Sequence, residues 1–199
     1  MDRAIQRIVL FMQQYIKILE NWKTDMTKGY KGVILEWIKT GVIAIILSFI
    51  IKATVVEAYL VPSSSMVPTI QIGDRILGNK FIYWFTDPKP GDIVVFRPPP
   101  EAHTNVPRYV KRVVAVEGDL VEIKNGLLYV NGKPRKEDYI KEPPEYTFGP
   151  KRVPKGHLFV LGDNRNNSHD GHVWEFLPKE NLLAKVFFRF WPPSRIGVL

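Results

Sequence analysis

The spacing of hydrophobic residues changes near residue 60. Before that point an amphipathic repeat over residues 4–20 is followed by an apolar run at residues 41–51 that contains a single Ser. After it, apolar residues come in short runs rich in Val, Ile and Phe, with Gly and Pro between them, a pattern typical of strands and turns. The sequence therefore predicts a helical N-terminal region followed by a mostly β domain.

The apolar run predicts a transmembrane helix over residues 36–58. A bilayer core is crossed by about 20 mostly apolar residues in a helix, and the run reaches this length with its flanks. Trp37 and Tyr59 suit the two interfaces, and Lys52 is close enough to one end to extend its amine to the head groups. The alternative is a buried helix of a soluble core. A cleaved signal peptide fits poorly, because no small-x-small pair follows at the usual place.

Charge gives an orientation to this anchor. Seven Lys or Arg precede residue 40, so the positive-inside rule places residues 1–35 in the cytoplasm and residues 59–199 outside. The amphipathic stretch 4–20 would lie on the inner membrane surface or pack on a partner. We expect a single-pass protein of the bacterial plasma (inner) membrane, with a thylakoid location still open.

The region after residue 59 predicts an antiparallel β domain. The expected strands are residues 74–79, 92–97, 109–116, 157–162 and 184–190. Asn125 and Gly126 lie between two apolar runs, which is a strong hairpin signal, and Asn131 and Gly132 form a second turn. The expected fold is mostly β: an N-terminal transmembrane helix, then an antiparallel β catalytic domain with a small inserted β lobe at about 118–155. No helix is expected after residue 60.

Composition narrows the possible chemistry. The 199 residues include no Cys, which excludes disulfides, thiol nucleophiles and cysteine metal sites. The net charge of +8 is spread without a dense basic stripe, so anionic lipid is a better partner than nucleic acid. The stretch HDGH at 169–172 does not have the spacing of a metal site that we recognise, and we expect neither a metal nor another cofactor.

The stretch VPSSSMVPTI at 61–70 holds a serine cluster between Pro62 and Pro68, which fix the backbone on both sides. A serine nucleophile needs a base. Lys111 is one candidate, because its neighbours on one face of a strand are apolar or aromatic and burial there would lower its pKa. A solvated lysine is the ordinary alternative. The other candidate bases are His103, His157, His169 and His172.

Four stretches together resemble the bacterial type I signal peptidases, also called leader peptidases. They are PSSSMVPT, GDIVVF, YVKRVVAVEGD and GDNRNNSHDGHVW, in this order after an apolar anchor. The resemblance implies a serine endopeptidase that removes signal peptides from exported preproteins after a small-x-small motif. It implies that Ser65 is the nucleophile and Lys111 the general base, forming a Ser-Lys dyad.

The resemblance also implies supporting roles. Ser63 would donate its hydroxyl to the oxyanion beside the Ser65 N–H, and Ser168 would hydrogen-bond and aim Lys111. The expected supporting polar network consists of Arg112, Asp163 and Asp170. Many family members have Arg where this chain has His172, so we expect an imidazole rather than a guanidinium to brace Asp170.

The substrate is expected to bind as an extended peptide beside a strand edge. Aliphatic pockets that admit only small side chains would be lined by Val61, Met66, Ile70, Val95 and Val110, whose alternative role is plain core. The aromatic stretches 81–85 and 187–191 would either contact lipid or belong to the core.

Three other functions remain open. The chain could be a non-catalytic membrane-tethered β module that binds an envelope partner. It could be a self-cleaving regulator of related catalytic geometry, although such proteins usually carry a DNA-binding head in place of an anchor. It could also be a Ser-His-Asp enzyme that uses one of the four histidines.

Overall fold

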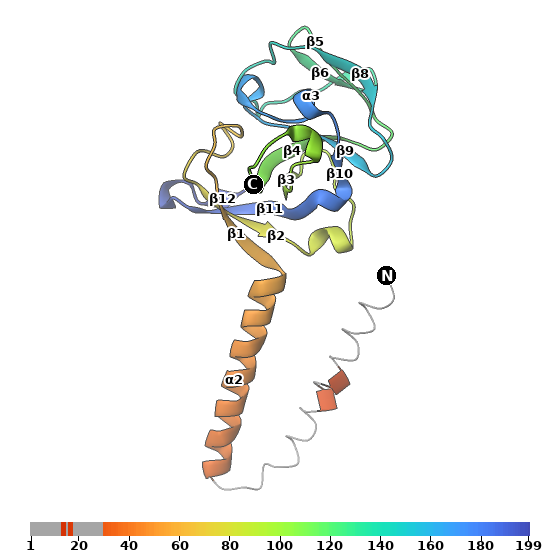
Figure 1. Cartoon of the computed structure of the whole chain (residues 1–199). Coiled ribbons are helices and arrows are strands. Elements are labelled where there is room, and N and C mark those ends of the chain that lie inside the picture. Colours follow the sequence, from red (N-terminus) through yellow and green to blue (C-terminus); the bar gives the residue numbers. More distant parts are fainter. Residues whose placement is uncertain (1–12, 15, 18–29) are drawn as a thin grey trace. The chain divides into compact units, whose positions relative to one another are not determined.

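The computed structural model describes residues 13–14, 16–17 and 30–199, in two compact units, 1–50 and 51–199 (Figure 1). The amphipathic stretch expected at residues 4–20 lies almost entirely outside the described residues. Helix α2 (Tyr30–Thr54) contains the apolar run. Its exposed apolar side chains include Val33, Leu35, Trp37 and Ile45. Among the described helices, none has the length and apolar character that a membrane crossing requires.

The helix ends earlier than the sequence predicts. It stops at Thr54, and Val56–Leu60 form strand β1, whereas the predicted anchor extends to residue 58. These residues pair antiparallel with β2 (Arg75–Asn79), from Val56 opposite Asn79 to Leu60 opposite Arg75. The β-branched and aromatic residues of this segment fit a strand well, so the cross-strand partner decides its conformation.

The second unit is built on one large antiparallel sheet with the strand order β1-β2-β11-β3-β4-β9-β10 and with β12 beside β11. Its remaining strands are β3 (Ile93–Phe96), β4 (Tyr109–Val116), β9 (His157–Leu161), β10 (Leu177–Pro178), β11 (Leu182–Trp191) and β12 (Gly197–Val198). The five predicted strands correspond to β2, β3, β4, β9 and β11. The mostly β, antiparallel fold class is therefore confirmed.

A smaller sheet is inserted between β4 and β9 and has the order β7-β6-β5-β8. Its strands are β5 (Leu120–Lys124), β6 (Leu127–Val130), β7 (Lys133–Pro134) and β8 (Phe148–Arg152), inside the stretch for which we predict a lobe. Asn125 and Gly126 join β5 to β6 with φ values of 50° and 74°. Two successive positive φ values are those of a type I′ hairpin turn, which explains the Asn-Gly pair.

The small lobe shares its core with the strand that carries Lys111. Val121, Ile123 and Leu128 of the lobe are buried in one cluster with Val114 and Ala115 of β4. A register shift between β4 and β9 at this point lets the consecutive side chains of Val114 and Ala115 enter the same cluster. The lobe therefore packs directly on the large sheet (Figure 1).

The expectation of no helix after residue 60 is wrong, because the structure has one short α-helix and five single-turn 3₁₀ helices there: Ile82–Trp84, Pro100–Ala102, Arg165–Asn167, Lys179–Asn181 and Pro193–Arg195. Gly171–Trp174 form the four-residue helix α3, and the Asp170 side chain accepts the His172 N–H at its start. A helix this short has no hydrophobic period to detect, and its only signal is the capping aspartate.

Candidate active site

The serine cluster lies in the loop between β1 and β2. The two ends of the loop are joined by Val61 N–H to the Asp74 carbonyl and Gly73 N–H to the Val61 carbonyl, both at 2.9 Å. Met66 and Ile70 are buried in the core at 1% and 0% exposure. The two hydrogen bonds and the two buried side chains attach the loop to the core. They hold Ser65, which is 8% exposed, in one place.

Lys111 extends from β4 toward this serine. Its Nζ lies 2.7 Å from Ser65 Oγ and 3.0 Å from the Val110 carbonyl oxygen. The lysine is only 3% exposed, and this desolvation lowers its pKa to about 8, although Asp170 and Asp163 act in the opposite direction. With this pKa, about one amine in ten is unprotonated at pH 7 and available as a base.

The Ser65 hydroxyl has one other side-chain neighbour. Ser63 Oγ lies 3.3 Å away, and Ser63 itself is exposed. The Ser65 N–H donates no backbone hydrogen bond within the residues that the structure covers. Two hydrogen-bond donors are thus available next to the hydroxyl.

A second loop, residues 162–170, holds the serine loop in place. Asn164 donates its N–H to the Ser65 carbonyl at 3.0 Å and its Nδ2 to the Ser64 carbonyl at 3.1 Å. Asn167 Nδ2 donates to Ser64 Oγ at 3.1 Å. The sequence interpretation missed both asparagines. Both lie in the stretch GDNRNNSHD, in which the sequence interpretation gave roles to Asp163, Ser168 and Asp170 and considered His169 as a base, but assigned nothing to the asparagines.

Gly162 is the point of closest approach between the two loops. A Cβ on this residue would come within 2.5 Å of the Ser65 carbonyl oxygen and would also collide with Ser168 Oγ. Glycine is therefore required here by the space that the serine loop occupies.

The bond expected from Ser168 to Lys111 is not formed in this structure. Ser168 Oγ is buried and has no hydrogen-bond partner among the described residues. The Lys111 amine instead donates to Ser65 and to the Val110 carbonyl. Ser168 Oγ lies against Gly162, next to the dyad but unpaired.

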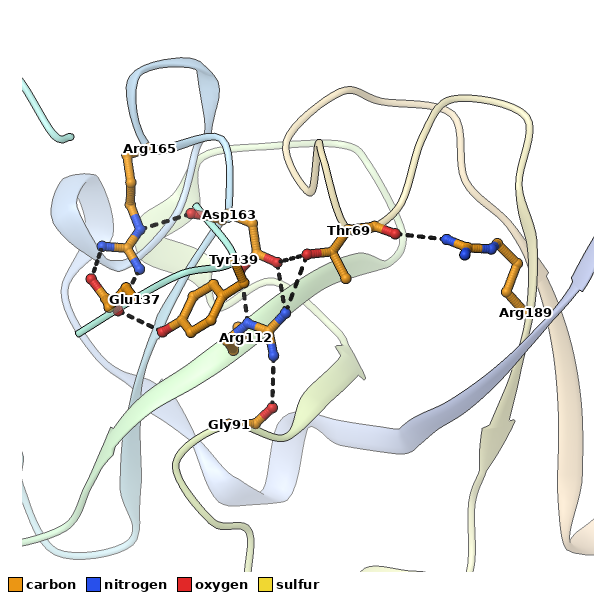
Figure 2. A network of polar contacts seen from close by, with 9 residues as sticks. Thr69, Gly91, Arg112, Glu137, Tyr139, Asp163, Arg165 and Arg189 are labelled. Atoms are coloured by element: carbon orange, nitrogen blue, oxygen red, sulfur yellow. Dashed lines mark hydrogen bonds and ion pairs between the residues drawn. The ribbon is translucent and has the colours of Figure 1, made fainter. Parts of the chain in front are cut away.

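Arg112, the residue after Lys111 on β4, binds Asp163 in a two-pronged contact (Figure 2). Nε to Oδ1 is 2.9 Å and Nη2 to Oδ2 is 2.7 Å, while Nη1 donates to the Gly91 carbonyl at 3.0 Å. The Thr69 hydroxyl donates to the same carboxylate at 2.5 Å. The structure thus joins these expected network members and adds Thr69, which ties them to the serine loop.

Asp170 accepts three hydrogen bonds. One comes from the Gly162 N–H at 2.7 Å, and the others come from the His172 backbone at 3.1 Å and ring Nδ1 at 2.8 Å. The His172 ring also stacks on Tyr146 with centroids 4.0 Å apart. His172 therefore contacts Asp170 through both its backbone and its ring.

A pocket of about 700 Å³ opens beside the serine and the lysine. Its lining residues include Val61, Met66, Val95 and Val110, of which the first three also belong to a buried core cluster, and Tyr109 and His169, which the sequence interpretation did not assign to it. Ile70 is not among its lining residues. It is completely buried in the cluster that contains Met66 and Ile76, so its predicted role in the pocket is corrected to core.

No histidine forms a hydrogen bond with Ser65 within the described part of the chain. His169 Nδ1 lies 3.1 Å from the Tyr109 hydroxyl, and His172 binds Asp170. In the same part of the chain, no three His, Asp or Glu side chains are grouped so that they could hold a metal ion.

A buried amine next to a serine hydroxyl, at the wall of an open pocket, is the arrangement of a serine hydrolase in which lysine takes the place of histidine. Residues 34–191 match the family described as "Signal peptidase, peptidase S26", and the chain belongs to this family.

Individual relatives agree with this assignment. The chain is 48% identical over 167 residues to "Probable signal peptidase I-2" of Synechocystis sp., covering 83% of this chain and 77% of the relative. It is 40% identical over 170 residues to "Signal peptidase I" of Leptolyngbya laminosa, covering 83% and 84%. It is 41% identical over 173 residues to "Thylakoidal processing peptidase 1, chloroplastic" of Arabidopsis thaliana, covering 83% and 51%.

A crystal structure of a signal peptidase I from Enterococcus faecalis V583 aligns with a TM-score of 0.40 and 29% identity, over 50% of this chain and 97% of that one. The family match and the relatives show that the protein is a serine endopeptidase that removes signal peptides.

Proposed function

We propose that Ser65 attacks the scissile carbonyl of the signal peptide and that Lys111 is its general base. The 2.7 Å contact between the two side chains carries this proposal. The unprotonated amine takes the Ser65 proton as the Oγ–carbon bond forms. The resulting ammonium then gives that proton to the leaving amine, which is the N-terminus of the mature protein. Water hydrolyses the acyl-enzyme with Lys111 again as the base.

The oxyanion of the tetrahedral intermediate is held by the Ser65 N–H and the Ser63 hydroxyl. Support comes from the free N–H and from the 3.3 Å separation of the two serine oxygens. Both donors act on charge that develops only in the transition state, so they contribute to kcat rather than to substrate binding.

Replacing Ser63 with alanine should lower kcat by about 100-fold and leave KM within a few-fold, because one oxyanion donor is lost. Cleavage of a preprotein by the purified full chain measures both constants. Ser63→Thr is the matched control, since it keeps a hydroxyl, and it should retain most of the activity. Equal losses in the two variants would show that Ser63 acts through packing and not through its O–H.

Substrate selection follows from the pocket. Strand β1 lies at the edge of the large sheet, so an extended peptide can add beside it with alternate side chains facing the pocket. Val61, Val95 and Val110 give that pocket an aliphatic wall. A wall of this kind accommodates small apolar side chains, which supports cleavage after a small-x-small motif.

The protein is anchored in a membrane through the helical N-terminal unit, with the catalytic domain outside the cytoplasm. Helix α2 exposes apolar residues such as Leu35, Trp37 and Ile45, a pattern that suits lipid surroundings. A bacterial plasma membrane is the simplest site. The printed name of the Arabidopsis relative, a thylakoidal peptidase, keeps the thylakoid as the second candidate.

Lipid contact also involves the catalytic domain. Trp84 and Phe85 are 66% and 61% exposed. A chain truncated before Val55, which keeps β1 intact, should bind anionic lipid vesicles in a flotation assay. Trp84→Ser with Phe85→Ser should weaken binding by at least about tenfold, because two large aromatic side chains no longer enter the interface. Failure of the truncated domain to float would contradict the lipid role of these aromatics.

A further inference from the structure

The inserted lobe contacts loop 162–170 at Pro143 and Glu145, which bind Asn166, and it contacts both active-site loops through residues 137–141, which we call the lobe arm. It lies between β7 and β8 (Figure 1). Ile140 forms a β-bridge with Pro68 of the serine loop. The Lys141 N–H donates to the Asp163 carbonyl at 3.0 Å. The arm thus touches both loops that build the site.

Glu137 of the arm forms a buried ion pair with Arg165 (Figure 2). Both guanidinium nitrogens Nη1 and Nη2 lie 2.7 Å from the carboxylate oxygens, and the side chains are 0% and 5% exposed for Arg165 and Glu137. The Tyr139 hydroxyl donates to the same carboxylate at 2.5 Å. Loss of one partner of such a pair leaves a charge buried without compensation, which is strongly unfavourable.

Arg165 links Glu137 to the loop that contacts Ser65. Its Nε donates to the Gly162 carbonyl at 3.0 Å. Gly162 is the residue that packs against the Ser65 carbonyl oxygen, and Asn164 donates to that same oxygen. Only Arg165 and the short backbone of Gly162 therefore separate the Glu137 carboxylate from the nucleophile.

Tyr139 reaches the lysine side of the site. Its ring faces the Arg112 guanidinium, with the guanidinium carbon 4.1 Å from the ring centroid (Figure 2). Arg112 is the neighbour of Lys111 on β4 and holds Asp163 in the bidentate contact. Stacking on the Tyr139 ring holds the Arg112 guanidinium in one orientation, which favours its bidentate contact with Asp163.

We propose that Glu137 is a positioning residue for the reaction: by holding Arg165 it fixes loop 162–170, and through that loop it sets the position of Ser65 relative to Lys111. The inserted lobe is then part of the support of the active site. The inference rests on the proposed roles of Ser65 and Lys111.

The first test is Glu137→Gln in the full-length chain, purified in detergent. The substitution keeps the shape and removes the charge that holds Arg165. We expect kcat to fall about 10- to 100-fold with KM within about threefold. The control is Glu142→Gln, at an exposed glutamate whose carboxylate lies 3.7 Å from the amine of the preceding residue, Lys141. This substitution also removes a carboxylate charge, and it should leave kcat unchanged.

The pH profile separates positioning from a simple loss of folded protein. Lys111 is faced by Asp163 and Asp170 from loop 162–170 and by the Tyr109 ring from its own strand, and Glu137→Gln alters none of them. A loosened loop hydrates Lys111, so the acid limb of kcat/KM should move to higher pH. A smaller folded fraction would lower kcat/KM by one factor without shifting that limb.

The second test is the double variant Glu137→Met/Arg165→Met, which replaces the ion pair by apolar side chains. Such replacements often restore stability, so Tm should return toward the wild-type value while kcat stays low, because no group holds the Gly162 carbonyl. Recovery of both Tm and kcat, or an unchanged kcat and acid limb in Glu137→Gln, would overturn the proposal. Loss of the dyad assignment would appear separately, as full activity in Lys111→Ala.

Discussion

Lys111→Ala should lower kcat/KM for signal-peptide cleavage by at least about 1,000-fold. The variant removes the proposed acceptor of the Ser65 proton, which lies 2.7 Å from the hydroxyl oxygen, and no other basic side chain forms a hydrogen bond with that hydroxyl among the described residues. General-base catalysis contributes about 100- to 10,000-fold in enzymes, and a nucleophile and its base act as a unit. Ser65→Ala and the double variant should therefore fall to the same residual rate.

The control for this prediction is Lys133→Ala, which removes an exposed lysine of β7 and should leave kcat/KM unchanged. Activity is measured with a purified preprotein, and Tm is followed in parallel. If Lys111→Ala keeps more than a tenth of the activity while His169→Ala abolishes it, a histidine is the base and the dyad assignment fails.

Lys111→Met should stabilise the fold at pH 7 by up to about 3 kcal/mol. Burial lowers the pKa of Lys111 from 10.5 to about 8, and each pKa unit corresponds to about 1.4 kcal/mol of preference between protonation states. Below pH 8 the folded protein must hold a desolvated ammonium, so the full cost is present. Methionine fills a similar volume without that charge.

The sign of the pH dependence follows from linkage. Between pH 8 and 10.5 the unfolded chain binds more protons at this site, so wild-type stability rises with pH. The gain from Lys111→Met should thus be largest below pH 8 and shrink as the pH approaches 10.5. Denaturant unfolding of both proteins across this range measures it. A gain that is the same at all pH values would contradict burial of a charged amine.

The loss of folding stability caused by Lys111 and its proposed activity as a base have the same physical origin. The dry surroundings of Lys111 destabilise the folded protein, and they also keep part of the amine unprotonated at neutral pH. Sites of this kind exchange stability for function. This explains why a lysine stands on a strand face beside the completely buried Val113.

The parts of the fold that the sequence predicts are those with local signals. The Asn125 and Gly126 turn needs positive φ at both positions, and the strand around Lys111 has a dense run of β-branched residues. Strand β1 has no such distinctive signal. Its apolar residues suit the end of a helix as well as a strand, and only pairing with β2 decides between them.

The residues of the site also divide into those that the local sequence predicts and those that depend on the three-dimensional packing. Motif resemblance singles out Ser65 and Lys111, which the structure brings together. Ile70 is aliphatic, as the expected pocket residues are, but the three-dimensional packing buries it in the core. Glu137 lies 28 positions from Arg165 in the chain, on an arm without regular structure, so nothing in the local sequence connects the two.

The most direct test of the account is the pH dependence of kcat/KM for the full chain in detergent, with a peptide substrate that has no titrating group near the cleavage site. The account predicts a tenfold rise per pH unit up to about pH 8 and a plateau above it, because the free enzyme must present an unprotonated Lys111. A rate that is level from pH 6 to 9, or that rises with a midpoint near 10.5, would contradict it.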